Sequence, residues 1–102
     1  SASPKSIYRL AHLLDIPELL ELALHAIESQ LTPVNVALEL FSNFSGVYDQ
    51  VRSVELDYFI ANYHAVKANG SMDKVEEKAA EGDLLYYTKT SMEVMRRLMA
   101  LK

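Results

Sequence analysis

The sequence predicts an all-α protein made of antiparallel helical hairpins, with about six helices. Apolar residues recur at the three- and four-residue spacing of helices, and no alternating run of strand length occurs. Half of the 102 residues are apolar, which is enough for a hydrophobic core at this length. The connections between the apolar segments look short, and helices joined by short connections pack as antiparallel pairs.

The first two predicted helices form one hairpin. The first covers Ile7 to Leu14 with Ser6 as its cap, and the second runs from Pro17 to Gln30. Asp15 is a good cap for the second helix, and a proline suits a first helical turn. The apolar residues of the second helix cover more than one stripe, so we expect neighbours on more than one side of it.

A second corner, at Leu31-Thr32-Pro33, begins the third predicted helix. The Thr32 hydroxyl can accept from the free N–H groups of the next turn, and Pro33 suits the first helical position. Asn35 stands where a capping box would place Glu or Gln, so it gives only a weak form of that motif. The third helix runs to about Phe44, and we expect Gly46 to end it as a left-handed cap.

Three further helices are predicted in the second half of the chain. The fourth runs from about Tyr48 to Lys67 and ends before the turn dipeptide Asn69-Gly70. A polar fifth helix follows from Met72 to Glu81, with Ser71 as its cap. Ser91 is expected to cap a last helix that reaches Lys102.

The last predicted helix carries a methionine face. Met92, Met95, Leu98 and Met99 share one side of it, and methionine side chains adapt easily to irregular surfaces. In one interpretation this face folds back onto the preceding helices as core. In the other it is a surface for self-association or peptide docking, which makes Met92, Met95 and Met99 candidate protein-binding residues.

The composition argues against several classes of partner. The formal net charge is −4, whereas nonspecific nucleic-acid binding needs a basic surface, so we expect no nucleic-acid partner. The chain has no cysteine, which excludes disulfides and thiol catalysis and is compatible with a cytoplasmic or nuclear protein. No apolar run approaches the roughly 20 residues of a membrane span, so we expect no membrane partner.

No pattern of catalytic residues is found, so we expect no enzyme, cofactor or metal site. His12, His25 and His64 each lack a second ligand at metal-binding spacing on the same helix face. A Gly-x-Ser-x-Gly motif and a glycine-rich phosphate loop are both absent from the sequence. Two glycosylation sequons begin at Asn43 and Asn69, and we attribute both asparagines to turn chemistry instead.

Three segments resemble one known family. They are YRLAHLLDIPEL at Tyr8–Leu19, LTPVNV at Leu31–Val36 and LDYFIANY at Leu56–Tyr63. The first resembles the last helical pair of a BTB/POZ domain, with an aromatic position, Ala, an apolar pair, a short corner and Leu. The second is similar to the Leu-Ser/Thr-x-Glu-Asn junction that leads into the 3-box or BACK helices, and the third to a family helix ending in Phe-Ile. The match covers about residues 7–72 and lies nearest the speckle-type POZ proteins and fungal BTB proteins.

This resemblance implies a non-enzymatic substrate adaptor of a cullin-RING ubiquitin ligase. It divides the chain into the last helical pair of a BTB domain (1–31), the 3-box or first BACK hairpin (32–70), and further BACK-type helices (71–102). It implies homo-oligomers through BACK. By position, it places a protein-binding groove between the third and fourth helices, near Leu38, Phe41, Ser42 and Tyr48.

The chain departs from the family pattern in two ways. The strands of a BTB domain are missing, so we expect the full-length protein, and not this chain alone, to bind a cullin N-terminal domain tightly. Val34 stands where the family usually has Glu, which changes the local charge. An alternative is a BTB-type scaffold or transcription-linked factor with no role in ubiquitin ligation.

Overall fold

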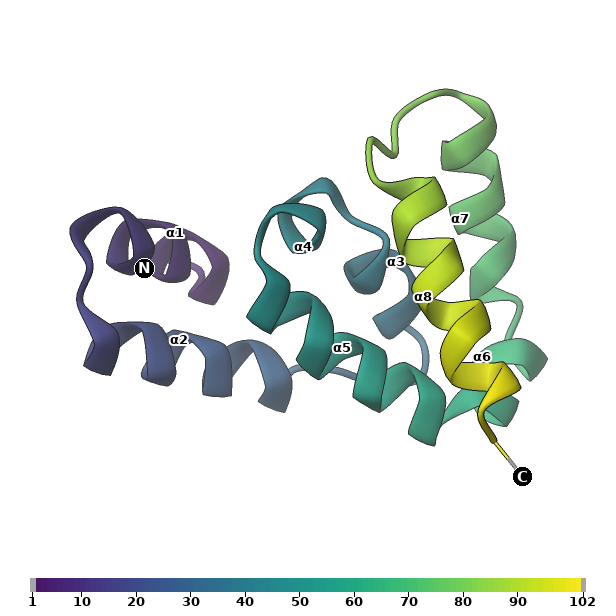
Figure 1. The fold of residues 1–102 in the computed structure, drawn as a ribbon, viewed down its shortest axis with the longest axis horizontal. Helices are drawn as coiled ribbons and strands as arrows, with labels where there is room; N and C mark the ends of the chain where they lie inside the picture. Colours follow the sequence, from purple (N-terminus) through teal and green to yellow (C-terminus); the bar gives the residue numbers. More distant parts are fainter. Residues whose placement is uncertain (1, 102) are drawn as a thin grey trace. The chain divides into compact units, whose positions relative to one another are not determined.

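The structure is a computed structural model that describes residues 2–101, and within them the chain forms eight helices and no strand (Figure 1). The predicted all-α class is confirmed, although the predicted number of about six helices is too low. The chain divides after Leu31 into two compact units. We call them the hairpin unit, up to Leu31, and the C-terminal unit, from Thr32 onward.

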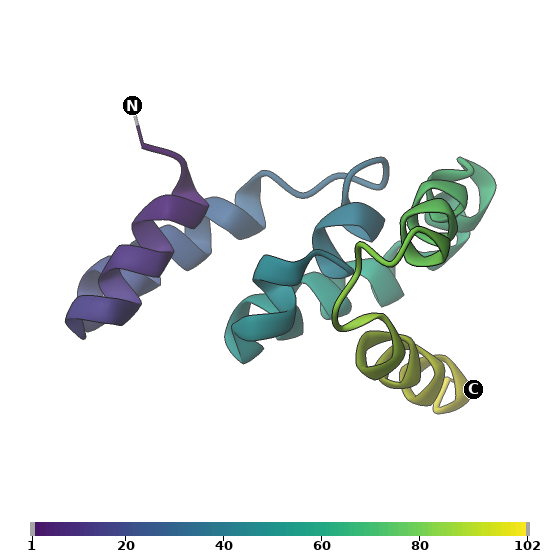
Figure 2. The same ribbon diagram turned by 90° about the horizontal axis from the view of Figure 1, so that it is seen from above.

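The hairpin unit consists of two helices packed side by side, α1 (Pro4–Leu14) and α2 (Pro17–Ser29) (Figure 2). Helix α1 begins earlier than predicted because Ser3, rather than Ser6, is its cap: the Ser3 Oγ accepts from the Ser6 N–H at 3.2 Å. The corner after α1 is closed by Asp15, which adopts the left-handed conformation with φ of 55°. This short corner returns the chain directly into α2.

Thr32 and Asn35 exchange two hydrogen bonds across the turn that precedes α3. The Thr32 N–H donates to Asn35 Oδ1 at 2.8 Å, and the Asn35 N–H donates to Thr32 Oγ1 at 3.1 Å. These are the bonds of a capping box, but they close the turn and do not cap α3: Asn35 is the residue before α3, and its side chain makes no cap bond to that helix. Helix α3 (Val36–Leu40) begins after this turn rather than at Pro33.

The third predicted helix is divided into α3 and α4 (Asn43–Val47). The break lies at Ser42, whose backbone is extended with φ of −66° and ψ of 155°. The Ser42 hydroxyl accepts from the Ser45 N–H at 3.2 Å and so caps a new helix. The apolar pattern continues across residues 36–47, so it does not indicate this break.

The fourth predicted helix is also divided, into α5 (Asp49–Ala61) and α6 (Tyr63–Ala68). They meet at Asn62, whose side-chain amide donates to the Tyr58 carbonyl oxygen at 2.9 Å. A side chain that bonds to the helix backbone in this way competes with the regular helical ladder and favours a break.

Gly46 does not end a helix, so its predicted left-handed role was wrong. It lies within α4, and a Cβ atom at this position would overlap the Tyr86 ring. The left-handed glycines are Gly70 and Gly82, with φ of 75° and 80°, at either end of α7 (Ser71–Ala80). Gly70 therefore takes the capping position that was predicted for Ser71.

Helix α5 is central to the C-terminal unit, because α3, α4, α6 and α8 (Tyr87–Met99) all contact it. Helix α7 packs on α3 and α6. The fully buried aliphatic side chains of this unit come from four helices: Val36 and Leu40, Val51, Val66, and Val75. Helix α8, which carries the methionine face, packs on this core through α5.

Helix α8 begins at Tyr87 rather than at Ser91, and its predicted end at Lys102 lies outside the described residues. Asn43 holds the turn that precedes it. The Asn43 amide donates to the Asp83 carbonyl oxygen at 3.0 Å, and Asn43 Oδ1 accepts from the Leu85 N–H at 2.8 Å. The chain therefore becomes helical at Tyr87, before the predicted cap residue Ser91.

Candidate interaction surfaces

The methionine face of α8 points away from the core. Met92, Met95 and Met99 are 45%, 50% and 79% exposed, whereas Val94 on the opposite side of the helix is buried. Of the two predicted arrangements, the structure therefore has the exposed one, and the methionines are not core residues. Exposed apolar side chains in a row along one helix are typical of a protein-binding surface.

Two ion pairs hold α8 in this orientation. Arg52 Nε lies 3.1 Å from Glu93 Oε2, and Arg97 Nη2 lies 2.9 Å from Asp57 Oδ1. Glu93 and Arg97 are four residues apart, so they lie on one side of α8 and bind it to α5. The methionines occupy another side and remain in solvent.

The Arg52 side chain of α5 bonds to two other helices of the C-terminal unit. Its guanidinium donates to the carbonyl oxygens of Ser45 and Gly46, both at 3.2 Å, and to Asp49 at 2.9 Å. Burial lowers the pKa of Arg52, whereas hydrogen bonds with Glu93 and Asp49 raise it. The two hydrogen bonds outweigh burial, so the pKa lies above its usual value. The group stays charged and joins α5 to α4 and α8. Sequence reasoning missed this role, because Glu93 lies 41 residues from Arg52.

The four residues of the predicted groove have different environments. Phe41 is 3% exposed, and its ring centroid lies 5.7 Å from that of Tyr87, so it belongs to the core. Ser42 is occupied as the cap of α4. Leu38 and Tyr48 are half-exposed, and the Tyr48 ring packs on Phe44 with centroids 5.0 Å apart. Leu38 and Tyr48 therefore offer large side chains to a partner, whereas the half-buried Ser42 hydroxyl is engaged in the cap.

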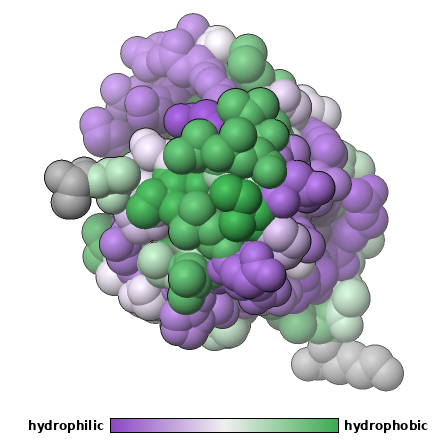
Figure 3. All heavy atoms as spheres, turned by 90° about the vertical axis from the view of Figure 1, so that its left-hand side faces the viewer, coloured by the Kyte–Doolittle hydropathy of each residue, from purple (hydrophilic) through white to green (hydrophobic). Residues whose placement is uncertain are grey.

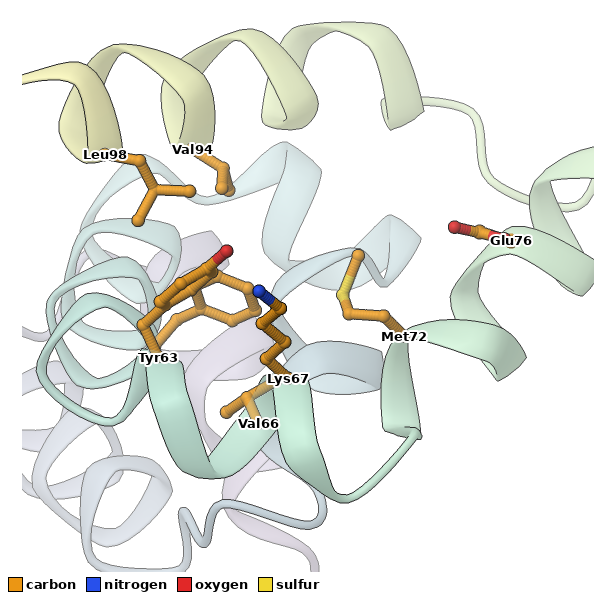
Figure 4. Close-up of a pocket in the computed structure, with 8 residues that line it drawn as sticks. Tyr63, Val66, Lys67, Met72, Glu76, Val94 and Leu98 are labelled. Atoms are coloured by element: carbon orange, nitrogen blue, oxygen red, sulfur yellow. The ribbon is translucent and has the colours of Figure 1, made fainter.

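A pocket of about 270 Å³ lies beside α8, which sequence reasoning did not reveal. Phe59 of α5, Tyr63, Val66 and Lys67 of α6, Met72 and Glu76 of α7, and Val94 and Leu98 of α8 line it (Figure 4). In Figure 4 the Met72 side chain lies between Lys67 and Glu76, so the two charges flank an apolar interior from different sides. Its volume is just below the roughly 300–1,000 Å³ of small-molecule sites, which suits one or two protein side chains.

The hairpin unit has an exposed apolar face of its own. Its members are large aliphatic side chains of α1, α2 and the corner between them: Leu10, Leu13, Leu14, Ile16 and Leu22. Figure 3, which looks at the α1 and α2 side of the molecule, shows hydrophobic side chains gathered there in one continuous area. Contiguous apolar area of this kind marks an interaction site more often than isolated exposed residues do.

Both sequon asparagines have structural roles, as turn chemistry predicted. Asn43 holds the turn before α8, and the Asn69 amide donates to the Pro33 carbonyl oxygen at 2.7 Å. Ser45, the hydroxyl residue of the first sequon, is fully buried. In the folded chain the side-chain amide nitrogen of each asparagine therefore donates a hydrogen bond to the backbone of a distant segment.

Residues 2–101 contain no group of three or more side chains that could hold a metal ion. In the same part of the chain no helix is both long enough and apolar enough to cross a membrane. Comparisons with models of protein families, with curated proteins and with solved structures find no match for this chain.

Proposed function

We propose that this chain is a protein-interaction module. The observation that carries the proposal is the exposed methionine face of α8, which ion pairs to α5 hold in solvent beside an apolar pocket. A second apolar face on the hairpin unit adds to it. Binding of a partner removes exposed apolar side chains from water. This burial is favourable by about 25 cal/mol per Å² of apolar area.

Within this class, the resemblance of residues 7–72 favours the C-terminal helical part of a BTB-type adaptor of a cullin-RING ubiquitin ligase. The all-helical fold supports this assignment because BACK and 3-box regions consist of helical hairpins. Leu38 and Tyr48 are the groove residues with side-chain surface for a cullin N-terminal domain. The site of action in this proposal is the cytoplasm or nucleus.

A pull-down tests the adaptor role. The chain, preceded by a complete BTB domain in the full-length protein, is mixed with a purified cullin N-terminal domain. We expect binding, and we expect the double variant Leu38→Asp, Tyr48→Asp to weaken it because both half-exposed side chains become acidic. Lys78→Glu, on exposed α7, serves as the matched surface control. No binding by the wild type would remove the ligase role and leave a BTB-type scaffold or transcription-linked factor.

A further inference from the structure

The turn between α6 and α7 carries the dipeptide Asn69-Gly70, in which a side-chain amide is followed directly by a glycine. Both residues are exposed, and Gly70 adopts the left-handed conformation with φ of 75°. Because glycine has no Cβ atom, no side chain shields the Gly70 backbone nitrogen from the Asn69 amide. The other three asparagines, Asn35, Asn43 and Asn62, precede valine, phenylalanine and tyrosine, whose larger side chains obstruct the same approach. Asn69 is therefore the asparagine that the following backbone nitrogen can reach with the least obstruction.

The Asn69 side chain joins two segments that lie far apart in the chain. Its amide nitrogen donates to the Pro33 carbonyl oxygen at 2.7 Å, and its oxygen accepts from the Ser71 N–H at 2.9 Å. The first bond reaches the turn before α3, and the second reaches the start of α7, which packs on α3. Only an amide can form the bond to Pro33, because an ionised carboxylate has no proton to donate.

We propose that Asn69 is a site of spontaneous deamidation, and that this reaction is a one-way switch of the turn between α6 and α7. The Gly70 nitrogen gives its proton to a hydroxide ion and attacks Asn69 Cγ. A bond forms between these two atoms, the bond from Cγ to Nδ2 breaks, and Nδ2 takes up a proton and leaves as ammonia. One water molecule then opens the resulting succinimide ring at either of its carbonyl carbons, which leaves aspartate or isoaspartate at position 69.

The reaction requires the Asn69 amide nitrogen to leave the Pro33 carbonyl oxygen, because this nitrogen is the leaving group. It therefore proceeds from a locally open turn, and exposed turns open more readily than a buried core. The ionised product has only acceptor oxygens, so it repels the Pro33 carbonyl oxygen instead of binding it. Isoaspartate also adds one main-chain atom between α6 and α7, which supply Lys67, Met72 and Glu76 to the pocket. Deamidation therefore opens the turn permanently and alters one side of the pocket, whether or not the pocket binds a partner.

Incubation of the full chain in mildly alkaline buffer, followed by peptide mapping with mass spectrometry, measures amide loss at each asparagine. We expect Asn69 to lose its amide about tenfold faster or more than Asn35, Asn43 or Asn62, with aspartate and isoaspartate both present. Gly70→Ala should slow the reaction about tenfold, because the new Cβ atom shields the attacking nitrogen. Alanine is strained at a φ of 75° and would loosen the turn, so a slower rate in this variant cannot come from a tighter fold. An unchanged rate in Gly70→Ala would overturn the proposed attack.

Asn69→Asp mimics one product and tests the switch separately. The Asn35 N–H, which donates to Thr32 beside Pro33, should exchange with deuterium about fivefold faster in this variant, as expected for the loss of one hydrogen bond. Gln50→Glu is the matched control, because it makes the same amide-to-acid change at an exposed position of α5. Equal amide loss at Asn69 and at the other asparagines would overturn the modification site. Equal exchange rates in the two variants would overturn the switch.

Discussion

At the scale of single residues, Arg52 connects three helices through one guanidinium group. It lies on α5, donates to two carbonyl oxygens of α4, and pairs with Glu93 of α8. Loss of this group leaves buried acceptors without a donor, and such atoms are costly in a protein interior. The orientation of the methionine face therefore depends on a residue that lies on a different helix.

We expect Arg52→Met to lower the free energy of unfolding by about 3 kcal/mol or more, which is typical when one partner of a buried ion pair is removed. Urea denaturation followed by circular dichroism measures this loss. Arg97→Met is the control, because the Arg97–Asp57 pair is more exposed and should cost no more than about 1 kcal/mol. Equal losses in the two variants would contradict the role assigned to Arg52.

Gly46 is the second residue whose role follows from packing. We expect Gly46→Ala to destabilise the chain by roughly 1–3 kcal/mol, because the new methyl group overlaps the Tyr86 ring. Thermal unfolding gives the stability change. Combining Gly46→Ala with Tyr86→Ala should cost less than the sum of the two single changes, since the smaller side chain makes room. Strict additivity would show that the overlap is not the cause.

At the scale of elements, the sequence pattern predicts the helices well and their breaks poorly. Apolar spacing identifies the α1–α2 hairpin, and Asn69-Gly70 marks the start of α7. The breaks at Ser42 and Asn62 depend on single side-chain hydrogen bonds within an apolar pattern that continues through them. Spacing of apolar residues cannot reveal which serine or asparagine bonds to its own backbone.

Only part of the candidate site could be predicted from the sequence, because its exposure depends on contacts between residues far apart in the chain. The row of methionines is visible in the sequence. Whether these side chains are buried in the core or exposed to solvent depends on which side of α8 packs against α5. Ion pairs from Glu93 and Arg97 to residues far away in the chain decide this. The pocket beside α8 combines side chains from four helices, so no local motif predicts it.

Helix caps offer a test at the same scale. We expect Thr32→Val to cost about 1 kcal/mol, because the Thr32 hydroxyl accepts from the Asn35 N–H in the capping box. Ser91→Ala is the comparison, because Ser91 was predicted as a cap and instead lies inside α8. It should change stability by less than about 0.5 kcal/mol. A larger loss for Ser91→Ala than for Thr32→Val in urea denaturation would contradict the observed helix starts.

At the scale of the whole molecule, the division after Leu31 has a consequence for folding. The C-terminal unit buries apolar side chains from α3, α5, α6, α7 and α8 against one another, whereas the hairpin unit contains only two helices. Chains below about 40 residues seldom fold without extra support.

We therefore expect a fragment of residues 32–102 to unfold cooperatively on heating, and a fragment of residues 1–31 to lack a cooperative transition. Circular dichroism at 222 nm measures both transitions. A C-terminal fragment without a transition would show that the two units depend on each other for their folding. The intact chain is the reference in the same buffer.

The proposed protein-binding role of α8 depends on a methionine face that lies in solvent, and methionine oxidation measures that exposure. Oxidation by dilute peroxide follows the exposure of each thioether and is measured for each residue by mass spectrometry. In the wild-type protein, Met95 and Met99 should oxidise faster than Met72, which is less exposed. Rates for Met95 and Met99 no higher than that for Met72 would contradict the exposed orientation of α8 on which the proposed function rests.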